Sequence, residues 1–330
     1  MMGDMKERVL RVLKENTPEY ISGEMLSRRL GVSRTAVWKY VNELKKEGYA
    51  IESSTKKGYK LVPASDILNE YEIRWGLETE VIGKDIRYFD EIDSTNNYAK
   101  RIAYDGCKEG TVIVADCQTA GRGRLGRSWL SSAGKGIWMS VILKPRIAPE
   151  DVQIITLAAS VAVCRAIAAV TGIHAEIKWP NDVQVGGRKL CGILTEMEAE
   201  IDRVAFVVVG IGLNVTLRRE QMDPAFRETA TSLAEEGAVG VRRAALVQAI
   251  LARFEGAYDH LLGGRFSVVP DQWRALSVSL GQAVRVLGLD GQVTVEGVAE
   301  AVDEEGALLV RDGAGEVHRV LSGEVSLRSS

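Results

Sequence analysis

The sequence predicts an α+β multidomain protein with an N-terminal winged helix-turn-helix, a central mixed-sheet domain and a C-terminal SH3-like β-barrel. Helix-turn-helix spacing marks the start of the chain, and strand-like runs with two long helices fill the middle. Short strands split by LDGQ, DEEG and DGAG form the end. The chain has 330 residues and is 46% apolar, which suits two or three cores. We expect domains over residues 1–64, 83–272 and 273–330, with a helical linker over residues 65–82.

The first 64 residues have the pattern of a winged helix-turn-helix. MKERVLRVLKE predicts an amphipathic helix, SGEMLSRRL predicts a second helix capped by Ser22, and SRTAVWKYVNELKKEG predicts a third capped by Ser33. Gly31 provides the turn between the second and third helices. Two alternating strands around residues 53–58 then form a wing.

The third helix carries the predicted DNA-reading face. Val37, Val41 and Leu44 recur at helical spacing and face inward, so the opposite side can enter a major groove. A basic helix face also occurs on modules that contact only proteins, and this alternative stays open. The expected DNA contacts are Ser33, Arg34, Thr35, Trp38, Lys39, Asn42, Lys56 and Lys57.

Charge is distributed unevenly along the chain. Residues 1–64 hold 13 Lys and Arg against 8 Asp and Glu, whereas the remainder holds 29 against 37. A single module of such modest charge binds DNA weakly, because specific sites usually recruit two half-sites through a symmetric dimer. We therefore expect a homodimer on a palindromic or direct-repeat operator.

Nothing in the sequence predicts export, a membrane anchor or a structural metal. The start of the chain lacks an apolar leader, so we expect a cytoplasmic protein. The apolar stretch over residues 152–170 contains Gln153, Thr156, Ser160 and Arg165, which favours a buried helix over a membrane span. The cysteines and histidines lack paired spacing, which argues against a zinc site, a disulfide framework or a Ser/His/Asp hydrolase; they are Cys107, Cys117, Cys164, Cys191, His174, His260 and His318.

The middle of the chain predicts a largely antiparallel or mixed sheet. Strand-like runs occur at residues 112–115, 137–143, 190–197 and 206–209, and a short glycine turn at residues 185–187 joins two strands. Helical patterns occupy residues 151–170 and about 243–262, where apolar residues line one face.

The stretch GRGRLGRSW at residues 121–129 is typical of a loop that wraps an anion. Its glycines have the spacing of a dinucleotide fingerprint, but RSWLSSAGKG and a second strand follow where that motif needs a helix. The positive charge must therefore come from Arg122, Arg124 and Arg127 themselves. An ordinary solvated surface loop is the alternative interpretation of these residues.

Four further motifs give the loop a context. They are EIDSTNNYA at 91–99, IKWPND at 177–182, RKLCGILTEM at 188–197 and VVVGIGLNV at 207–215. With the Gly/Arg loop they resemble the biotin protein ligase family, and with the N-terminal module they resemble its bifunctional members, the biotin operon repressors. The resemblance runs from near the N-terminus to the last few residues, and the order of its motifs is more specific than any one of them.

The resemblance implies a class II synthetase-like catalytic domain of the biotin and lipoate ligase type. Biotin and MgATP would form biotinyl-5′-AMP and pyrophosphate, and a lysine of a biotin carboxyl carrier protein domain would then attack the mixed anhydride. ATP, Mg²⁺ and biotin are thus the expected substrates or cofactors, with no tightly bound metal. Biotinyl-5′-AMP would also order the Gly/Arg loop and act as corepressor on operator DNA.

Side-chain chemistry and the resemblance together suggest the site residues. Negative charge accumulates when a carboxylate attacks the α-phosphate, and Lys189 is the first choice for the stabilising cation, with Arg124 second. The expected biotin-binding residues are Ser94, Thr95, Asn96, Gln118, Gly121, Arg122, Gly123, Arg124, Lys189 and Gly192. The expected ATP or adenylate contacts are Arg124, Arg127, Trp129, Asn181, Asp182, Asn214, Glu324 and Arg328, with Asp182 also the candidate ligand for Mg²⁺.

Some alternatives remain open at this point. Trp129 is equally consistent with a core side chain under the loop, and Leu125 and Ser128 stand where some relatives have basic residues. A lipoate ligase and a DNA-binding biotin sensor without ligase activity are the other functions that fit these motifs.

Overall fold

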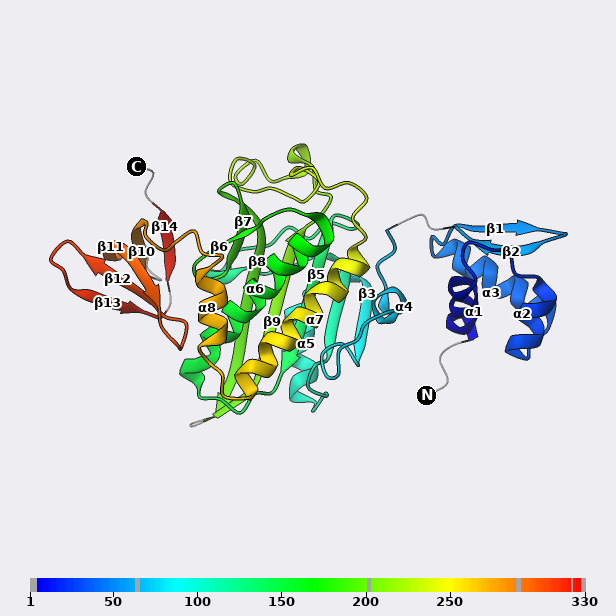
Figure 1. The fold of residues 1–330 in the computed structure, drawn as a ribbon, viewed down its shortest axis with the longest axis horizontal. Coiled ribbons are helices and arrows are strands. Elements are labelled where there is room, and N and C mark those ends of the chain that lie inside the picture. The colour runs from blue at the N-terminus through cyan, green and yellow to red at the C-terminus, as the bar shows by residue number, and fades with distance from the viewer. Residues whose placement is uncertain (1–4, 63–65, 201–202, 289–291, 322, 328–330) are drawn as a thin grey trace. The chain divides into compact units, whose positions relative to one another are not determined.

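The structure is a computed structural model that describes residues 5–62, 66–200, 203–288, 292–321 and 323–327 (Figure 1). A small helical unit begins the chain, a mixed-sheet domain follows, and a small antiparallel sheet ends it. The predicted α+β multidomain fold is therefore confirmed.

The N-terminal unit contains the three predicted helices and the wing. Ser22 accepts a hydrogen bond from the Met25 N–H and Ser33 accepts one from the Ala36 N–H, both at 3.1 Å, so each serine caps the helix that follows it. Gly31 has φ of 69°, the left-handed conformation expected of the turn. The elements are α1 (Met5–Glu15), α2 (Gly23–Leu30), α3 (Arg34–Lys46), β1 (Ile51–Ser54) and β2 (Gly58–Leu61), with β1 and β2 antiparallel.

The central domain is built on a seven-stranded sheet with the order β3-β4-β5-β9-β8-β7-β6. The β3–β4 pair is parallel and the other neighbours are antiparallel, so the sheet is mixed as predicted. Its strands are β3 (Ile86–Ile92), β4 (Val112–Gln118), β5 (Gly136–Leu143), β6 (Glu176–Lys178), β7 (Asp182–Val185), β8 (Arg188–Glu200) and β9 (Arg203–Asn214). The helices are α5 (Thr95–Tyr104), α6 (Val152–Thr171), α7 (Arg243–Leu262) and α8 (Val268–Arg274), with short 3-10 turns at Arg124–Gly126, Pro149–Asp151 and Arg219–Gln221.

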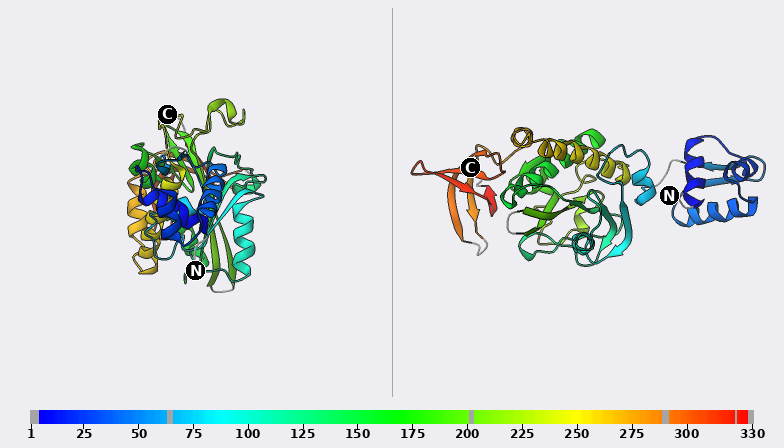
Figure 2. Two further views of the ribbon diagram at one scale, coloured as in Figure 1. Left: turned by 90° about the vertical axis from the view of Figure 1, so that its right-hand side faces the viewer. Right: turned by 90° about the horizontal axis from the view of Figure 1, so that it is seen from below.

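Helices cover both faces of this sheet (Figure 2). Because side chains alternate along a strand, Ile113, Ile142 and Val208 pack against α5, whereas Val114 and Val141 join the large core with α6 and α7. On this face, polar side chains at the start of α5 line a small pocket.

Helix α6 is the apolar stretch that was predicted to lie in the protein interior. A window within residues 149–171 is long and apolar enough to cross a membrane, but 72% of it is buried inside the protein. Ser160 on this helix is fully buried and bonds back to the Leu157 carbonyl at 2.7 Å. The buried-helix prediction agrees with this packing.

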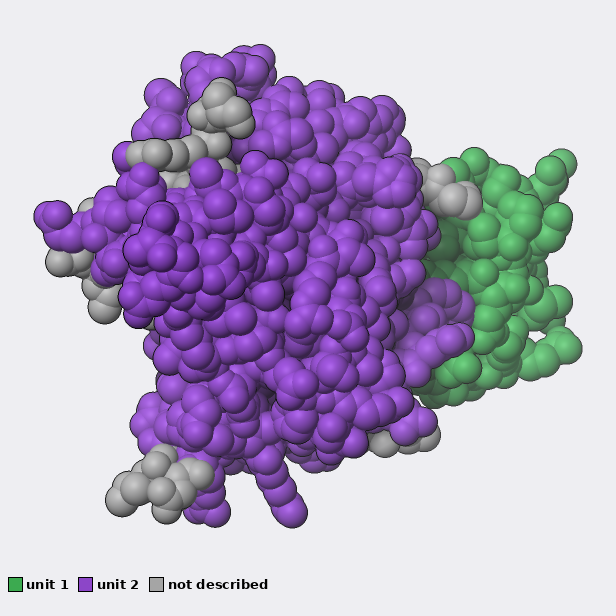
Figure 3. All heavy atoms as spheres, turned by 60° about the vertical axis from the view of Figure 1, so that its left-hand side comes forward, with its two compact units in different colours: residues 1–67 green, residues 68–330 purple. Residues whose placement is uncertain are grey.

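The predicted linker helix over residues 65–82 is wrong in extent. Within the described part of this segment, only α4 (Glu70–Arg74) is helical. Asn69 caps its start, accepting from the Glu72 N–H at 2.9 Å, and Gly76 with φ of 90° follows its end. The chain divides into compact units between Ile67 and Leu68 (Figure 3), so α4 belongs to the larger one.

The remainder of the linker segment is held by helix α7. The Glu255 carboxylate, 8% exposed, accepts hydrogen bonds from the backbone N–H groups of Glu80, Val81 and Ile82 at 2.5, 2.8 and 2.6 Å. Gln248 Nε2, with two N–H groups, lies within hydrogen-bond distance of three backbone carbonyls of residues 72–75. These side chains satisfy backbone groups that a continuous helix would have paired internally, so tertiary contacts override the helical pattern.

The C-terminal strands form a five-stranded antiparallel sheet with the order β13-β12-β11-β10-β14. Two side chains of the central domain bind backbone carbonyls of this C-terminal region. Trp179 Nε1 donates to Gly306 O at 3.1 Å, and Arg274 donates to Val302 O at 2.7 Å. Its strands are β10 (Ala283–Leu287), β11 (Val293–Val302), β12 (Leu308–Asp312), β13 (Val317–Val320) and β14 (Glu324–Leu327).

Candidate active site

A small pocket lies where α5 begins on the open face of the central sheet. The structure places there six of the ten predicted biotin contacts, together with Trp129. As it stands the cavity has a volume of about 30 Å³, room for about one water molecule. A bicyclic ligand therefore requires part of the wall to move. The lining residues are Ser94, Thr95, Asn96, Gln118, Arg122, Trp129, Met139, Gly192, Leu194, Gly210, Ile211 and Gly212.

The polar side chains of the pocket are connected to one another. Gln118 Oε1 accepts from the Thr95 backbone N–H at 2.8 Å and from its hydroxyl at 3.0 Å. Ser140 on β5 lies 2.8 Å from the Thr95 hydroxyl and 2.6 Å from Asn96 Oδ1. Ser94 caps α5 by accepting from the Asn97 N–H at 3.4 Å. Fixed rotamers of this kind prepare donors and acceptors for a neutral polar ligand.

Glycines on β9 allow α5 and the loop to approach the sheet. A Cβ atom at Gly210 would lie 2.2 Å from Asn96 Oδ1, and one at Gly212 would lie 2.5 Å from Trp129 Nε1. On β8, a Cβ atom at Gly192 would lie 3.0 Å from the Trp129 ring. The floor of the pocket is therefore backbone, and the motif GIGLN provides it through its two glycines.

Trp129 lies across these glycines. Its ring has Lys189 Nζ 5.4 Å from its centroid, and its Nε1 is buried with no hydrogen-bond partner among the described residues. The indole thus belongs to the wall of the pocket and brings an unused donor to it.

Lys189 stands at one side of this wall, facing a carboxylate. Its Nζ is 2.6 Å from Asp182 Oδ1, and the two side chains are 38% and 26% exposed. They meet because β7 and β8 are joined by Gly186 and Gly187, with φ of 54° and 76°, which match the left-handed positions of the predicted tight turn. Lys189 is also held through its backbone, which pairs with Thr229 and Thr231 at 2.7 and 2.9 Å.

Arg124 points away from the small pocket. Its guanidinium donates to Asn181 Oδ1 at 3.0 Å and to the Gly323 carbonyl at 3.1 Å. Both Arg124 and Asn181 line a second cavity of about 370 Å³ with residues of α6 and β8 and with Leu321, which follows β13. The Gly/Arg loop thereby contacts the KWPND turn and Gly323, the residue that precedes β14 of the C-terminal sheet.

Other predicted residues take different places. Gly121 and Gly123 hold the loop through backbone bonds to Trp129 and Arg127 at 2.9 and 2.7 Å, and the Arg127 side chain is exposed. Asn214 is buried and donates to the Thr231 carbonyl at 2.9 Å. The side chain of Glu324 and the whole of Arg328 lie outside the described residues.

The Gly/Arg loop has no helix behind it, as predicted from its sequence. A single 3-10 turn at Arg124–Gly126 includes Leu125 with φ of 56°, and the chain then runs into β5. A dinucleotide-type helix N-terminus is therefore excluded at this loop, and its charge comes from side chains.

Known proteins match each part of the chain. A model of the Biotin/lipoate A/B protein ligase family matches residues 88–214, an HTH domain matches residues 6–60, and the Biotin protein ligase C terminal domain matches residues 279–328. The bifunctional ligase/repressor BirA of Bacillus spizizenii is 41% identical over 99% of this chain and 100% of its own length. This chain belongs to the bifunctional biotin ligase/repressor family.

More distant family members agree with this assignment. BirA of Escherichia coli is 28% identical over 94% of each chain. The biotin protein ligase from Aquifex aeolicus, solved in complex with biotin and ATP, has a TM-score of 0.62 and 30% identity, and covers 75% of this chain and 100% of its own. Fold, ligase domain and N-terminal module are thus those of the biotin ligase family.

The family's N-terminal module presents the predicted DNA-reading face to solvent. Val37, Val41 and Leu44 are buried, whereas Trp38 is 59% exposed. The other predicted contacts are Ser33, Arg34, Thr35, Lys39, Lys56 and Lys57, all exposed, and Asn42, half-buried.

Two polar residues of the site were not predicted from the sequence. Ser140 lies within an apolar run, and Glu196 lies within the quoted RKLCGILTEM motif without having been assigned a role. Glu196 accepts from Asn96 and Lys100 at 2.9 and 2.8 Å. Strand alternation gives a signal for Glu196, because it lies two and four residues beyond Leu194 and Gly192 and so shares their face.

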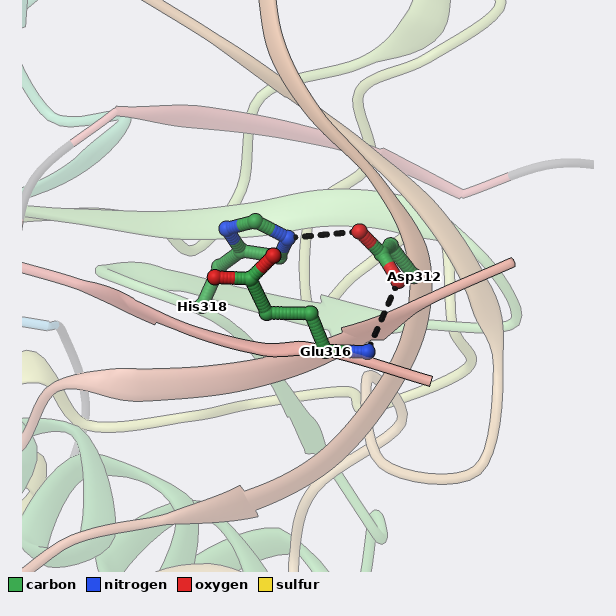
Figure 4. Close-up of side chains that lie close together, drawn as sticks. All are labelled: Asp312, Glu316 and His318. Atoms are coloured by element: carbon green, nitrogen blue, oxygen red, sulfur yellow. Dashed lines mark hydrogen bonds and ion pairs between the residues drawn. The ribbon is translucent and has the colours of Figure 1, made fainter. Parts of the chain in front are cut away.

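Two carboxylates lie near one of the histidines. In the β12–β13 hairpin, His318 Nε2 is 2.8 Å from Asp312 Oδ2, and with Glu316 these groups could hold a metal ion (Figure 4). Asp312 also accepts from the Ala314 and Glu316 backbone N–H groups at 2.9 Å, so it closes the hairpin turn. Its hydrogen bond raises the pKa of His318. Hairpin pairing brings these residues together across the turn.

Proposed function

We propose that this chain is an ATP-dependent biotin protein ligase that also represses transcription of biotin genes, with biotinyl-5′-AMP as corepressor. One observation carries the ligase half. A pocket of fixed amide and hydroxyl groups over a glycine floor adjoins a lysine that is paired with the KWPND carboxylate. The amide and hydroxyl groups of the pocket can bind a neutral ring that carries donors and an acceptor. The lysine can bind the carboxylate of the ligand beside the phosphates of ATP.

The ureido ring of biotin is the ligand group that we place among Thr95, Asn96 and Gln118. Those side chains present both donors and acceptors, as a urea requires. Trp129, with its apolar ring and buried Nε1, would cover the thiophane and valeryl carbons. The carboxyl end of the ligand would then extend toward Lys189.

Adenylation joins two anions, so charge stabilisation is the main requirement. The biotin carboxylate oxygen attacks the α-phosphorus of ATP, the bond to the bridging oxygen of pyrophosphate breaks, and pyrophosphate leaves. Lys189 would hold the two anions together and neutralise the charge that develops between them. No covalent bond to the protein forms.

Transfer completes the reaction without a further nucleophile from this chain. The neutral ε-amine of a lysine on a biotin carboxyl carrier domain attacks the acyl carbon of the adenylate. The bond to the phosphate oxygen breaks, AMP leaves, and the nitrogen loses a proton as the amide forms. Because water would compete for the anhydride, the Gly/Arg loop is expected to stay closed until the carrier arrives.

Asp182 is the residue that would share Mg²⁺ with ATP. Mg²⁺ is usually bound by one or two carboxylates together with phosphate oxygens, and Asp182 already faces a cation, Lys189, at 2.6 Å. The donor set fits an ion that arrives with the nucleotide. When bound, it would neutralise the phosphates and polarise them toward attack.

We place the repressor activity in a cytoplasmic homodimer on operator DNA. The exposed face of α3 would enter the major groove of one half-site while the wing lysines contact phosphates. Ordering of the Gly/Arg loop by adenylate would build part of the dimer surface and so favour the dimer. The carrier domain would compete with the second protomer for that surface. Sedimentation with and without adenylate tests this link, because an unchanged dimer fraction would contradict it.

Exchange of labelled pyrophosphate into ATP tests the ligase. We expect exchange that depends on biotin and on Mg²⁺, and no exchange with lipoate. Exchange with lipoate alone would make the chain a lipoate ligase. Tight biotin binding without any exchange would leave a DNA-binding biotin sensor.

A further inference from the structure

Glu196 lies at the centre of a charged network beside the ligand pocket. Its carboxylate accepts from Asn96 Nδ2 at 2.9 Å and Lys100 Nζ at 2.8 Å, and lies 3.2 Å from Arg122 Nη1. Its side chain is only 20% exposed. Three elements therefore meet on one carboxylate: the helix α5, the strand β8 and the Gly/Arg loop.

The positions of these residues follow from secondary structure. Asn96 and Lys100 are one helical turn apart on α5 and so share a face. On β8, Glu196 follows Leu194 on the pocket side of the sheet. Arg122 reaches this place from the loop, and it also donates to Asn97 Oδ1 on α5 at 2.9 Å.

The network does more than pair surface charges. An exposed ion pair contributes little because water screens it, but here the carboxylate is half-buried and bonded to a side chain of the pocket wall. Burial raises the pKa of Glu196, but hydrogen bonds from Lys100 and Asn96 and the charge of Arg122 outweigh it and leave this pKa below its ordinary value. Glu196 is therefore an anion at neutral pH, able to attract both cations.

We propose that Glu196 is a positioning residue that latches the Gly/Arg loop closed over the ligand pocket. It acts by holding Arg122 and, through Asn96, by fixing the wall that the ligand contacts. The latch sets how long biotin and its adenylate stay bound. This inference rests on the proposed ligase function for the identity of the ligand. The proposed effect of Glu196 on closure of the loop does not depend on that function.

The loop on the other side is held by Arg124, which donates to Asn181 and Gly323. Loss of the Glu196 contact therefore leaves the Arg122 side chain with its bond to Asn97 Oδ1 and loosens one end of a loop that stays attached at the other. The expected consequence is faster opening of the loop without loss of the fold.

The test compares Glu196→Gln with Glu198→Gln. Glu198 lies two residues further along the same strand and is exposed. Glu198→Gln therefore removes an equal charge at a distance from the loop. The readouts are the dissociation rate of labelled biotin and the rate of trypsin cleavage after Arg124 and Arg127, which every variant keeps, in ligand-free protein. We expect both rates to rise about tenfold for Glu196→Gln, as for the loss of ~1.4 kcal/mol, and to stay unchanged for Glu198→Gln.

A second variant guards against a folding defect. Arg122→Gln alters an exposed side chain and leaves Glu196 bonded to Lys100 and Asn96. The latch predicts that Arg122→Gln raises the same two rates, and that the double variant is no faster than Glu196→Gln alone. Independent, additive effects of the two substitutions would overturn the latch.

The two proposals fail separately. If biotin does not bind the unaltered protein, the ligase proposal fails and the trypsin rates alone decide the latch. If biotin binds and both rates of Glu196→Gln match those of the unaltered protein, the latch is wrong and the ligase proposal stands.

Discussion

Lys189 and Asp182 face each other across the β7–β8 hairpin, with Nζ and Oδ1 2.6 Å apart. Both side chains are partly exposed, at 38% and 26%. The hairpin fixes this spacing through two glycines in the left-handed conformation, Gly186 and Gly187. A pair of opposite charges held in this way can receive an anion on its lysine and a cation on its carboxylate.

The first prediction concerns the charge of Lys189. Lys189→Gln should lower the rate of adenylate formation about 10²- to 10³-fold, the usual effect of removing a group that stabilises developing charge. Single-turnover formation of adenylate at saturating biotin and ATP measures this directly. Lys108→Gln, at an exposed lysine, is the matched control. Full activity of Lys189→Gln would mean that the stabilising cation lies elsewhere.

The second prediction concerns the glycine floor. A Cβ atom at residue 212 would lie 2.5 Å from Trp129 Nε1, so Gly212→Ala must displace the indole. We expect the Kd for biotin to rise about 10- to 100-fold, with the unfolding midpoint nearly unchanged because the loop can shift. Gly256→Ala in α7, where a Cβ atom meets nothing within 4 Å, serves as control. Calorimetric titration that finds equal affinities would argue against Trp129 as part of the pocket wall.

The third prediction concerns the buried carboxylate that holds the linker segment. Glu255 accepts from three backbone N–H groups, and Glu255→Gln places an amide N–H against some of them. The free energy of unfolding should fall by about 2–3 kcal/mol, measured by urea denaturation. Glu78→Gln, at an exposed glutamate of the same segment, should change it by less than about 0.5 kcal/mol. Equal losses of unfolding free energy in the two variants would show that the negative charge, and not the hydrogen bonds from the backbone N–H groups, accounts for the effect of Glu255.

The fourth prediction concerns the DNA-reading face. Trp38→Ala should weaken binding to the operator at least about tenfold and leave adenylate formation intact, because Trp38 is exposed on α3. Lys57→Gln on the wing should lower the slope of log K against log salt by about 0.9, the value for one lost phosphate contact. Binding curves at several salt concentrations separate the two effects. Retention of full affinity by both variants would favour a module that contacts proteins.

Local rules gave much of the fold in advance. Ser22 and Ser33 were predicted as caps because a short hydroxyl side chain can bond the free N–H groups of a helix start, and both do so. Alternating apolar runs predicted the central strands, and consecutive glycines predicted the turn at Gly186. Each of these features depends on residues close together in the sequence.

The features that could not be predicted from the sequence depend on contacts between residues far apart in the chain. The linker pattern is helical, but Glu255, more than 170 residues away, holds its second half in another conformation. Ser140 and Glu196 join the site through strand register, which places them opposite α5. A one-residue shift of register would turn either side chain to the other face.

The most direct test of the central claim follows one labelled molecule through both half-reactions. The purified chain is incubated with Mg²⁺, biotin and ATP labelled at the α-phosphate, and an apo carrier domain is added once labelled adenylate has formed. We predict biotin-dependent labelled adenylate that disappears on addition of the carrier, with release of labelled AMP and one biotin bound to the carrier lysine. Absence of adenylate with biotin, in a chain that still binds it, would contradict the account.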